Sequence, residues 1–152
     1  AAGAAIGSDV PFFLYGCVCD CGGRGEAVAP VADYSWRPRL LLIKPPFGVP
    51  TPVAYRRWLD SRMVPGFPYA PQSTRGGELV NDLERPVFEK YPVLGTLKAR
   101  LLQCPGVSAA LMSGSGSTVF AVLEEEATPA DVIRTAQEEL GGEVWTCMTG
   151  LR

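Results

Sequence analysis

The spacing of apolar residues changes several times along this chain, and each spacing predicts a different element. A continuous apolar run bounded by prolines predicts a buried strand at residues 39–44. Apolar residues at helical spacing predict a helix over residues 82–103, which Pro86 and Pro92 should divide into two pieces. Further short apolar runs predict strands at residues 108–112, 118–123 and 143–148.

Prolines and capping residues mark where two more helices should begin. Thr51 followed by Pro52 predicts one helix start, and Thr128 followed by Pro129 predicts another, with the threonine as the cap in each. Several prolines and glycines predict an irregular loop at residues 61–77.

The front of the chain has a different pattern. Residues 10–15 and 17–21 are typical of short paired strands, and a turn should follow at residues 23–26. From residue 39 onward the predicted order is strand, helix, helix, strand, strand, helix, strand. This order indicates an α+β fold, a ferredoxin-like sandwich in which helices cover one face of a largely antiparallel sheet.

Composition narrows the functional classes. Hydrophobic residues make up 47% of the chain and charged residues 20%, which suits an ordinary packed core. The net charge is -2 and there is no basic run, so we expect neither nucleic acid nor an anionic membrane as a partner. The sequence lacks the run of about 18 apolar residues that a transmembrane helix needs.

The cysteines and the absence of histidine limit the chemistry further. Cys17, Cys19 and Cys21 alternate, which would place their sulfurs on one face of a strand, whereas paired zinc ligands are usually separated by two or more residues. An odd cysteine count without a secretory signal predicts reduced thiols and a cytoplasmic location. The spacing of two and the absence of histidine predict that the cysteines hold no metal. In a plant or alga the location would be the plastid. Without histidine, Ser–His and Cys–His catalysis are excluded within this chain.

Asp9 is the first residue that could carry chemistry. It follows a segment of small residues typical of a helix end and precedes a strongly apolar run, so its carboxylate could face a cleft. A turn or capping aspartate is the alternative, and residue type alone favours it.

The loop Ser113, Gly114, Ser115, Gly116 is the second candidate, because it lies between two predicted strands. Glycines allow positive φ and a close backbone approach, and successive N–H groups can form an anion site. The sequence is neither a Walker A loop nor a G-x-G-x-x-G helix start. A flexible hairpin loop is the alternative.

Thr51 and Tyr55 form the third candidate. They lie one helical turn apart, so they should share one side of the predicted helix. For Tyr55 taken alone, residue type favours packing in the core.

Together these segments resemble one family, the 4-diphosphocytidyl-2-C-methyl-D-erythritol kinases of the GHMP superfamily. The ordered set covers nearly the whole chain and is more specific than any single segment; homoserine and mevalonate kinases share the glycine motif but not the set. The matching segments are Gly7-Ser8-Asp9-Val10-Pro11-Phe12-Phe13, Gly23-Arg24-Gly25-Glu26, Lys44-Pro45 through Thr51-Pro52, Asn81-Asp82-Leu83-Glu84, and Met112 to Phe120.

The resemblance implies ATP-dependent phosphorylation, with Mg²⁺ carried on the ATP, of the 2-hydroxyl of a CDP-linked methylerythritol in the non-mevalonate route to isoprenoids. Asp9 would pair with a lysine near the enzyme's N-terminus and orient or deprotonate the attacking hydroxyl. The loop from Ser113 to Gly116 would line the phosphate and substrate end. Tyr55 would stack on the cytosine ring, and Thr51 would belong to the same substrate-binding segment.

The sequence also departs from the family. The first motif, which holds that lysine, and the second motif, a glycine- and serine-rich ATP loop, have no match here. We therefore expect a piece of a longer enzyme that is inactive alone, with residues 1–36 from its N-terminal domain and residues 37–152 forming its C-terminal domain. Two alternatives to this function are another GHMP enzyme, such as a homoserine kinase, and a binding module without catalysis.

Overall fold

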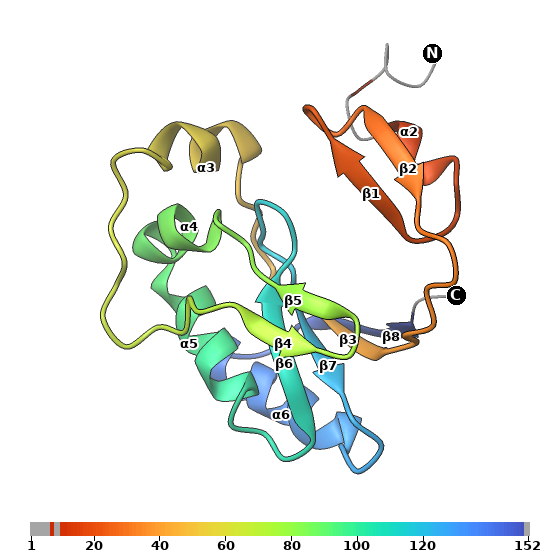
Figure 1. Ribbon diagram of the computed structural model, residues 1–152. Coiled ribbons are helices and arrows are strands. Elements are labelled where there is room, and N and C mark those ends of the chain that lie inside the picture. The colour runs from red at the N-terminus through yellow and green to blue at the C-terminus, as the bar shows by residue number, and fades with distance from the viewer. Residues whose placement is uncertain (1–6, 8–9, 151–152) are drawn as a thin grey trace. The chain divides into compact units, whose positions relative to one another are not determined.

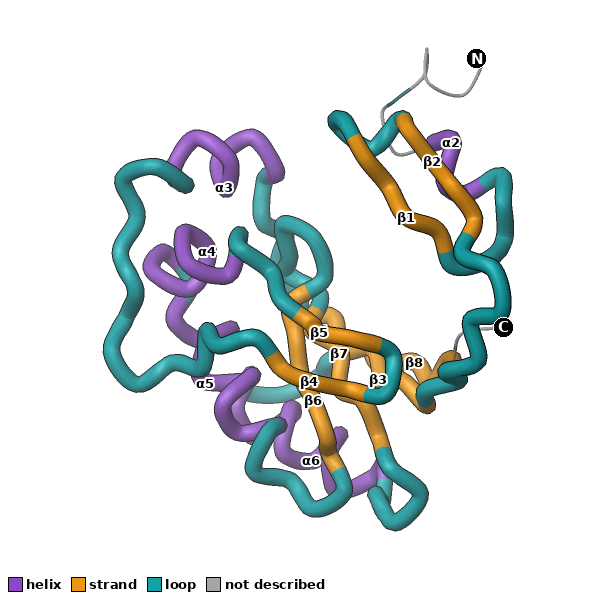
Figure 2. Tube along the Cα trace, in the orientation of Figure 1, coloured by secondary structure: helices purple, strands orange, loops and turns teal. Residues whose placement is uncertain are grey.

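The computed structural model describes residue 7 and residues 10–150 of the chain. These residues form two compact units: the first ends at Arg37, and the second runs from Pro38 to Gly150. Figures 1 and 2 show the elements of each unit. None of the helices in the described residues is long and apolar enough to cross a membrane. The assignment of residues 1–36 and 37–152 to two domains of one enzyme stays a prediction.

The first unit contains a short helix and a hairpin. Helix α2 (Val10–Phe13) occupies part of the segment predicted as a strand, so that prediction is wrong. Pro11 fits the first turn of a helix because its missing N–H would have no partner there. The hairpin is formed instead by β1 (Cys19–Gly22) and β2 (Ala27–Pro30), joined by the predicted turn, in which Gly23 has a φ of 68°.

A four-stranded antiparallel sheet forms the centre of the second unit, in the order β6-β7-β3-β8. Its strands are β3 (Arg39–Lys44), β6 (Val107–Met112), β7 (Val119–Leu123) and β8 (Trp145–Gly150). All four strands were predicted from apolar runs, and all four are confirmed within a few residues at their ends. Strand β3 lies inside the sheet between β7 and β8. Of its apolar run, Leu41 and Ile43 are buried, and Leu40 and Leu42 on the opposite face are partly buried.

Helices cover one face of this sheet (Figures 1 and 2). Helix α5 (Pro92–Leu101) packs against β6 and β7, and α6 (Pro129–Leu140) packs against β3 and α5. The core between helices and sheet includes Leu41, Ile43, Leu94, Leu97, Leu101, Ala110, Met112, Val119, Ala121, Val132 and Ala136. The predicted α+β sandwich is therefore confirmed.

The long helix predicted at residues 82–103 is divided, as its prolines indicated. Helix α4 (Glu84–Lys90) ends before Tyr91, and Pro92 begins α5. Pro86 does not break α4, because it lies in the first turn, where a backbone N–H has no intrahelical acceptor.

The segment predicted as an irregular loop contains a small hairpin, so that prediction is partly wrong. Strands β4 (Gln72–Thr74) and β5 (Gly77–Leu79) pair with each other. Each has only three residues, which is too short for an alternating pattern to be recognised. The hairpin is fixed to the edge of the main sheet by the side chain of Gln72, which both donates to and accepts from Ala110.

Candidate functional site: a glycine-serine loop beside a helix start

The loop between β6 and β7 is a tight turn. Ser113 donates its N–H to the carbonyl of Thr118 at 2.8 Å, and Gly116 donates to the carbonyl of Ser113 at 2.9 Å. Gly114 and Gly116 have φ values of 54° and 85°, a region that favours glycine. At Gly116 an added Cβ would lie 2.8 Å from the sulfur of Met112, so a side chain there would force the core to shift.

This loop presents unused donors. Within the described residues, the N–H groups of Gly114 and Ser115 have no hydrogen-bond acceptor, and neither residue is buried. Backbone N–H groups on a glycine-rich turn are suited to bind an anion such as a phosphate group. The geometry is therefore compatible with a phosphate loop.

Thr51 lies beside this loop. Its Oγ1 is 2.8 Å from the Oγ of Ser115, which joins two segments that are 64 residues apart in the sequence. Helix α3 (Thr51–Arg57) has Pro50 at its N-cap position and no side-chain cap bond. The prediction that Thr51 caps this helix is therefore wrong, because its hydroxyl contacts the loop instead.

A second contact ties the base of the loop to the end of β3. Ser117 is fully buried, and its hydroxyl donates to the carbonyl of Phe47. Lys44 donates from Nζ to the Ser117 hydroxyl at 2.9 Å. The loop is thus fixed at Ser117, while Gly114 and Ser115 at its tip stay accessible.

Tyr55 is not a core residue. Its side chain is 64% exposed, so the core-packing interpretation is wrong. Tyr55 lies one helical turn after Thr51, so the two residues share one side of α3, the helix whose start contacts the loop. The helix is held against α4: Arg57 pairs with Glu89 at 2.9 Å, and Arg85 donates to the carbonyl of Trp58 at 2.5 Å.

Asp9 lies outside the described residues, so its predicted role is neither supported nor opposed by this geometry. In the part of the chain that the structure describes, no group of three or more His, Cys, Asp or Glu side chains could hold a metal ion. The five cysteines are free thiols, and the sulfurs of Cys17 and Cys19 lie 3.8 Å apart.

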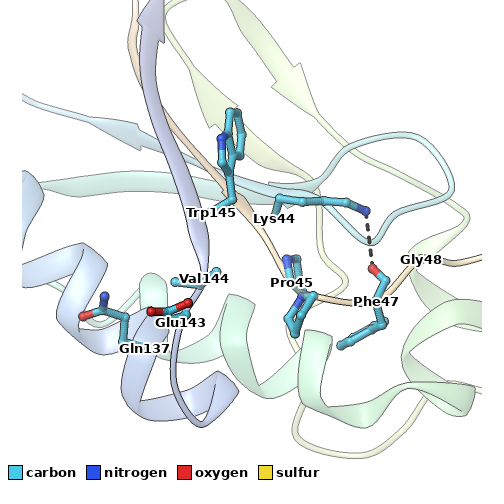
Figure 3. A pocket seen from close by; sticks show the side chains of 9 residues that line it. Lys44, Pro45, Phe47, Gly48, Gln137, Glu143, Val144 and Trp145 are labelled. Atoms are coloured by element: carbon cyan, nitrogen blue, oxygen red, sulfur yellow. Dashed lines mark hydrogen bonds between the residues drawn. The ribbon is translucent and has the colours of Figure 1, made fainter.

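An open pocket of about 720 Å³ lies next to this site but does not contain it. Its lining residues are Lys44, Pro45, Pro46, Phe47, Gly48, Gln137, Glu143, Val144 and Trp145. Figure 3 shows Lys44 turned toward the Phe47 carbonyl, which it contacts at 3.4 Å. None of the predicted site residues that the structure describes lines this pocket, so its size alone does not make it the site.

Sequence reasoning missed the side chains that support the loop. Asn81 donates to the carbonyls of Met112 and Gly114, and Glu84 accepts from the N–H of Met112. Glu84 is in turn paired with Lys98 at 2.6 Å, and both side chains are almost completely buried. The available signal was the presence of charged residues on helix faces that are otherwise apolar, where a charge requires a partner.

Comparisons with known proteins show which proteins this arrangement resembles. Residues 71–142 match the model described as "GHMP kinases C terminal". The matched segment runs from the β4–β5 hairpin to the end of α6 and includes the glycine-serine loop. Residues 71–142 are therefore similar to the C-terminal domain of the GHMP kinases.

More particularly, the chain is similar to 4-diphosphocytidyl-2-C-methyl-D-erythritol kinases. It is 40% identical over 144 residues to the kinase of that name from Methylacidiphilum infernorum (isolate V4), covering 93% of this chain and 50% of the relative. It is 37% identical over 138 residues to the one from Thermodesulfovibrio yellowstonii, covering 82% and 47%. The chain thus spans about half the length of the curated relatives it matches.

A solved structure agrees with these relatives. The crystal structure of a 4-(cytidine 5'-diphospho)-2C-methyl-D-erythritol kinase superposes with a TM-score of 0.64 at 32% sequence identity. The match covers 95% of this chain and 54% of that one. The resemblance that the sequence segments indicated is thereby confirmed.

Proposed function

We propose that the complete protein containing this chain is an ATP-dependent kinase that phosphorylates 4-diphosphocytidyl-2-C-methyl-D-erythritol. The observation that carries the proposal is the contact between Thr51 and Ser115, because it joins the segment that we expect to bind the substrate to the glycine-serine loop. The names of the relatives and of the solved structure support the same substrate.

The loop and α3 would each recognise a different part of this substrate. The unused N–H groups of Gly114 and Ser115 are suited to phosphate oxygens, whether on the substrate or on the group being transferred. The exposed ring of Tyr55 is suited to stack on a cytosine base. A CDP-linked polyol carries both features in one molecule.

The reaction needs little covalent chemistry from the protein. The 2-hydroxyl oxygen forms a bond to the γ-phosphorus of ATP, the bond from that phosphorus to the bridging oxygen breaks, and ADP leaves. Asp9 would accept or orient the proton of the attacking hydroxyl. Such a transfer depends mainly on positioning and on electrostatic stabilisation, which a fixed loop can provide.

The test is release of ADP by the complete protein, supplied with Mg²⁺ and ATP, when the acceptor is changed. We expect turnover with 4-diphosphocytidyl-2-C-methyl-D-erythritol and a kcat/KM about 5- to 150-fold lower with homoserine, because that acceptor has no base for Tyr55 to stack on. Preference for homoserine would identify a different GHMP kinase. Binding of the CDP-linked polyol without ADP release would favour a module that binds but does not catalyse.

A further inference from the structure

Strand β6 lies at the edge of the main sheet, yet the backbone groups of Ala110 and Met112 are bonded by side chains. Gln72 donates to the carbonyl of Ala110 at 2.8 Å and accepts from its N–H at 3.0 Å. Two residues further along, Glu84 accepts from the N–H of Met112 at 2.9 Å, and Asn81 donates to its carbonyl at 2.7 Å. These bonds meet the need of part-buried backbone groups for partners.

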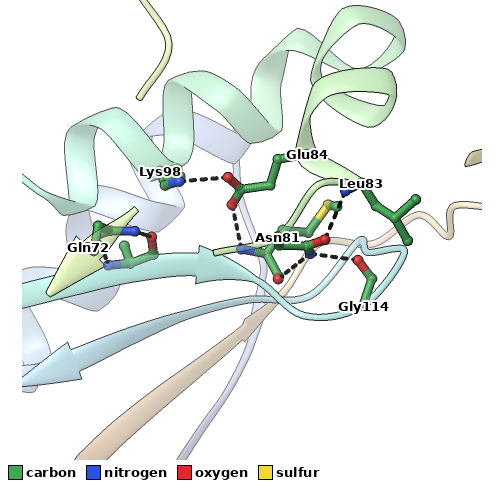
Figure 4. A network of polar contacts seen from close by, with 8 residues as sticks. Gln72, Asn81, Leu83, Glu84, Lys98 and Gly114 are labelled. Atoms are coloured by element: carbon green, nitrogen blue, oxygen red, sulfur yellow. Dashed lines mark hydrogen bonds and ion pairs between the residues drawn. The ribbon is translucent and has the colours of Figure 1, made fainter. Parts of the chain in front are cut away.

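Asn81 differs from Gln72 in reaching beyond the strand (Figure 4). Its Nδ2 also donates to the carbonyl of Gly114 at 2.8 Å, so one amide group holds the carbonyls on both sides of Ser113. Its Oδ1 accepts from the N–H of Leu83 at 3.0 Å, just before α4. Only one orientation of the amide satisfies all three partners, because the reverse would place an oxygen against two carbonyls.

The hydrogen bond from Asn81 to the carbonyl of Gly114 determines which backbone groups the loop presents to a ligand. The carbonyl of Gly114 is turned toward Asn81, whereas the N–H groups of Gly114 and Ser115 have no acceptor in the described part of the chain. An anion site needs donors at its surface and no competing carbonyl oxygen. A loop that rotated by one peptide would present an acceptor and repel a phosphate.

We propose that Asn81 is a positioning residue that holds the glycine-serine loop with its N–H groups free for a phosphate-bearing ligand. This inference rests on the proposed function for the identity of that ligand. The residue does not touch the ligand itself; it acts through Gly114. The carbonyl of Asn81 accepts from the backbone N–H of Glu84 at 3.0 Å. The side chain of Glu84, paired with Lys98, accepts from the N–H of Met112, so the start of α4 is fixed to the end of β6.

The test substitution is Asn81→Asp in the complete protein. Aspartate keeps an oxygen for the N–H of Leu83, so the start of α4 is preserved, but it loses the donor and sets a negative charge against two carbonyls. We expect kcat/KM with ATP and 4-diphosphocytidyl-2-C-methyl-D-erythritol to fall about 10- to 100-fold, equivalent to about 1.4–2.8 kcal/mol. Asn81→Ser, which removes the donor without adding charge, should lower it in the same direction by less.

Gln72→Glu is the matched control. It makes the same change from amide to carboxylate on the same strand edge, facing Ala110 instead of the loop. Both variants should lose thermal stability, but Gln72→Glu should keep kcat/KM within about two-fold of the parent, since surface-edge changes act on folding and not on the loop. If Asn81→Asp matches Gln72→Glu in kcat/KM as well as in melting temperature, Asn81 only satisfies the strand edge and the proposal is wrong.

A second readout does not depend on kinase activity. Inorganic pyrophosphate is titrated into ¹⁵N-labelled protein, and the amide signals of Gly114 and Ser115 are followed. We expect both to shift in the parent and in Gln72→Glu and to stay unmoved in Asn81→Asp. Shifts of equal size in all three proteins, or none in the parent, would overturn the inference. Loop shifts without any turnover would contradict the proposed function alone.

Discussion

The hydroxyls of Thr51 and Ser115 lie 2.8 Å apart, and this contact fixes the start of α3 against the tip of the glycine-serine loop. One partner comes from the segment that resembles a substrate-binding helix, and the other from a loop with unused N–H donors. A phosphate held on the loop would therefore lie beside α3, where the aromatic ring of Tyr55 is exposed. The account of the site depends on this relationship.

Removing that contact should weaken substrate binding. Thr51→Val keeps the shape of the side chain but removes the hydroxyl, and Ser115→Ala removes its partner. A hydrogen bond of this kind contributes about 0.5–1.5 kcal/mol, so KM for the CDP-linked polyol should rise about 2- to 12-fold in each single variant. The double variant should be no worse than either single one, because both remove the same bond. Effects that add fully in steady-state kinetics would show that the two hydroxyls act separately.

Substitution of Tyr55 should separate binding from folding. Base stacking on an aromatic ring contributes about 1–3 kcal/mol, so Tyr55→Ala should raise the dissociation constant of the CDP-linked polyol about 5- to 150-fold in calorimetry. Because the ring is 64% exposed, the melting temperature should hardly change. Tyr55→Phe keeps the ring and serves as the control, with affinity close to that of the parent. Unchanged affinity in Tyr55→Ala would remove this residue from the site.

The buried pair of Glu84 and Lys98 should affect stability strongly. Lys98→Met keeps most of the length of the side chain but leaves the Glu84 carboxylate buried without a counter-charge. Leaving one buried charge unpaired costs about 3–5 kcal/mol, so the free energy of unfolding in urea should fall by about that amount. The double variant Glu84→Gln with Lys98→Met removes both charges and should recover most of the loss. A single variant as stable as the parent would show that the pair is not strongly coupled.

The same pair predicts a dependence of stability on pH. Burial raises the pKa of the Glu84 carboxyl above its ordinary value of 4.5, against the opposing effect of the hydrogen bonds from Lys98 and Met112. The folded protein therefore holds this proton more tightly than the unfolded chain does. The contribution of Glu84 is fully present below pH 4.5 and is lost as the pH rises through the raised pKa.

This dependence is measured as a difference between two proteins. Urea unfolding is followed from pH 4 upward for the parent and for Glu84→Gln/Lys98→Met, which has no group titrating at this position. The parent's advantage in free energy of unfolding should shrink as the pH rises. A constant or growing difference would contradict the direction of the pKa shift.

The sheet and its two covering helices could be predicted from the sequence because their apolar spacing is regular. The short elements could not: Val10–Phe13 is too short for either period to be clear, and the hairpin at residues 72–79 depends on the bonds between Gln72 and Ala110. For the site, the glycines and Tyr55 carry a recognisable signature. The contact of Thr51 with Ser115, and the hold of Asn81 on the loop, depend on tertiary placement that no local pattern encodes.

The most direct test of the account is the turnover of Asp9→Asn in the complete protein, measured beside the parent with ATP and 4-diphosphocytidyl-2-C-methyl-D-erythritol. The change keeps the size of the side chain and removes its charge. If Asp9 acts on the attacking hydroxyl, kcat and kcat/KM should fall together by about 10²–10⁴-fold, while KM for ATP and the melting temperature stay close to those of the parent. An Asp9→Asn protein with the parent's kcat would contradict the proposed mechanism, whatever its melting temperature.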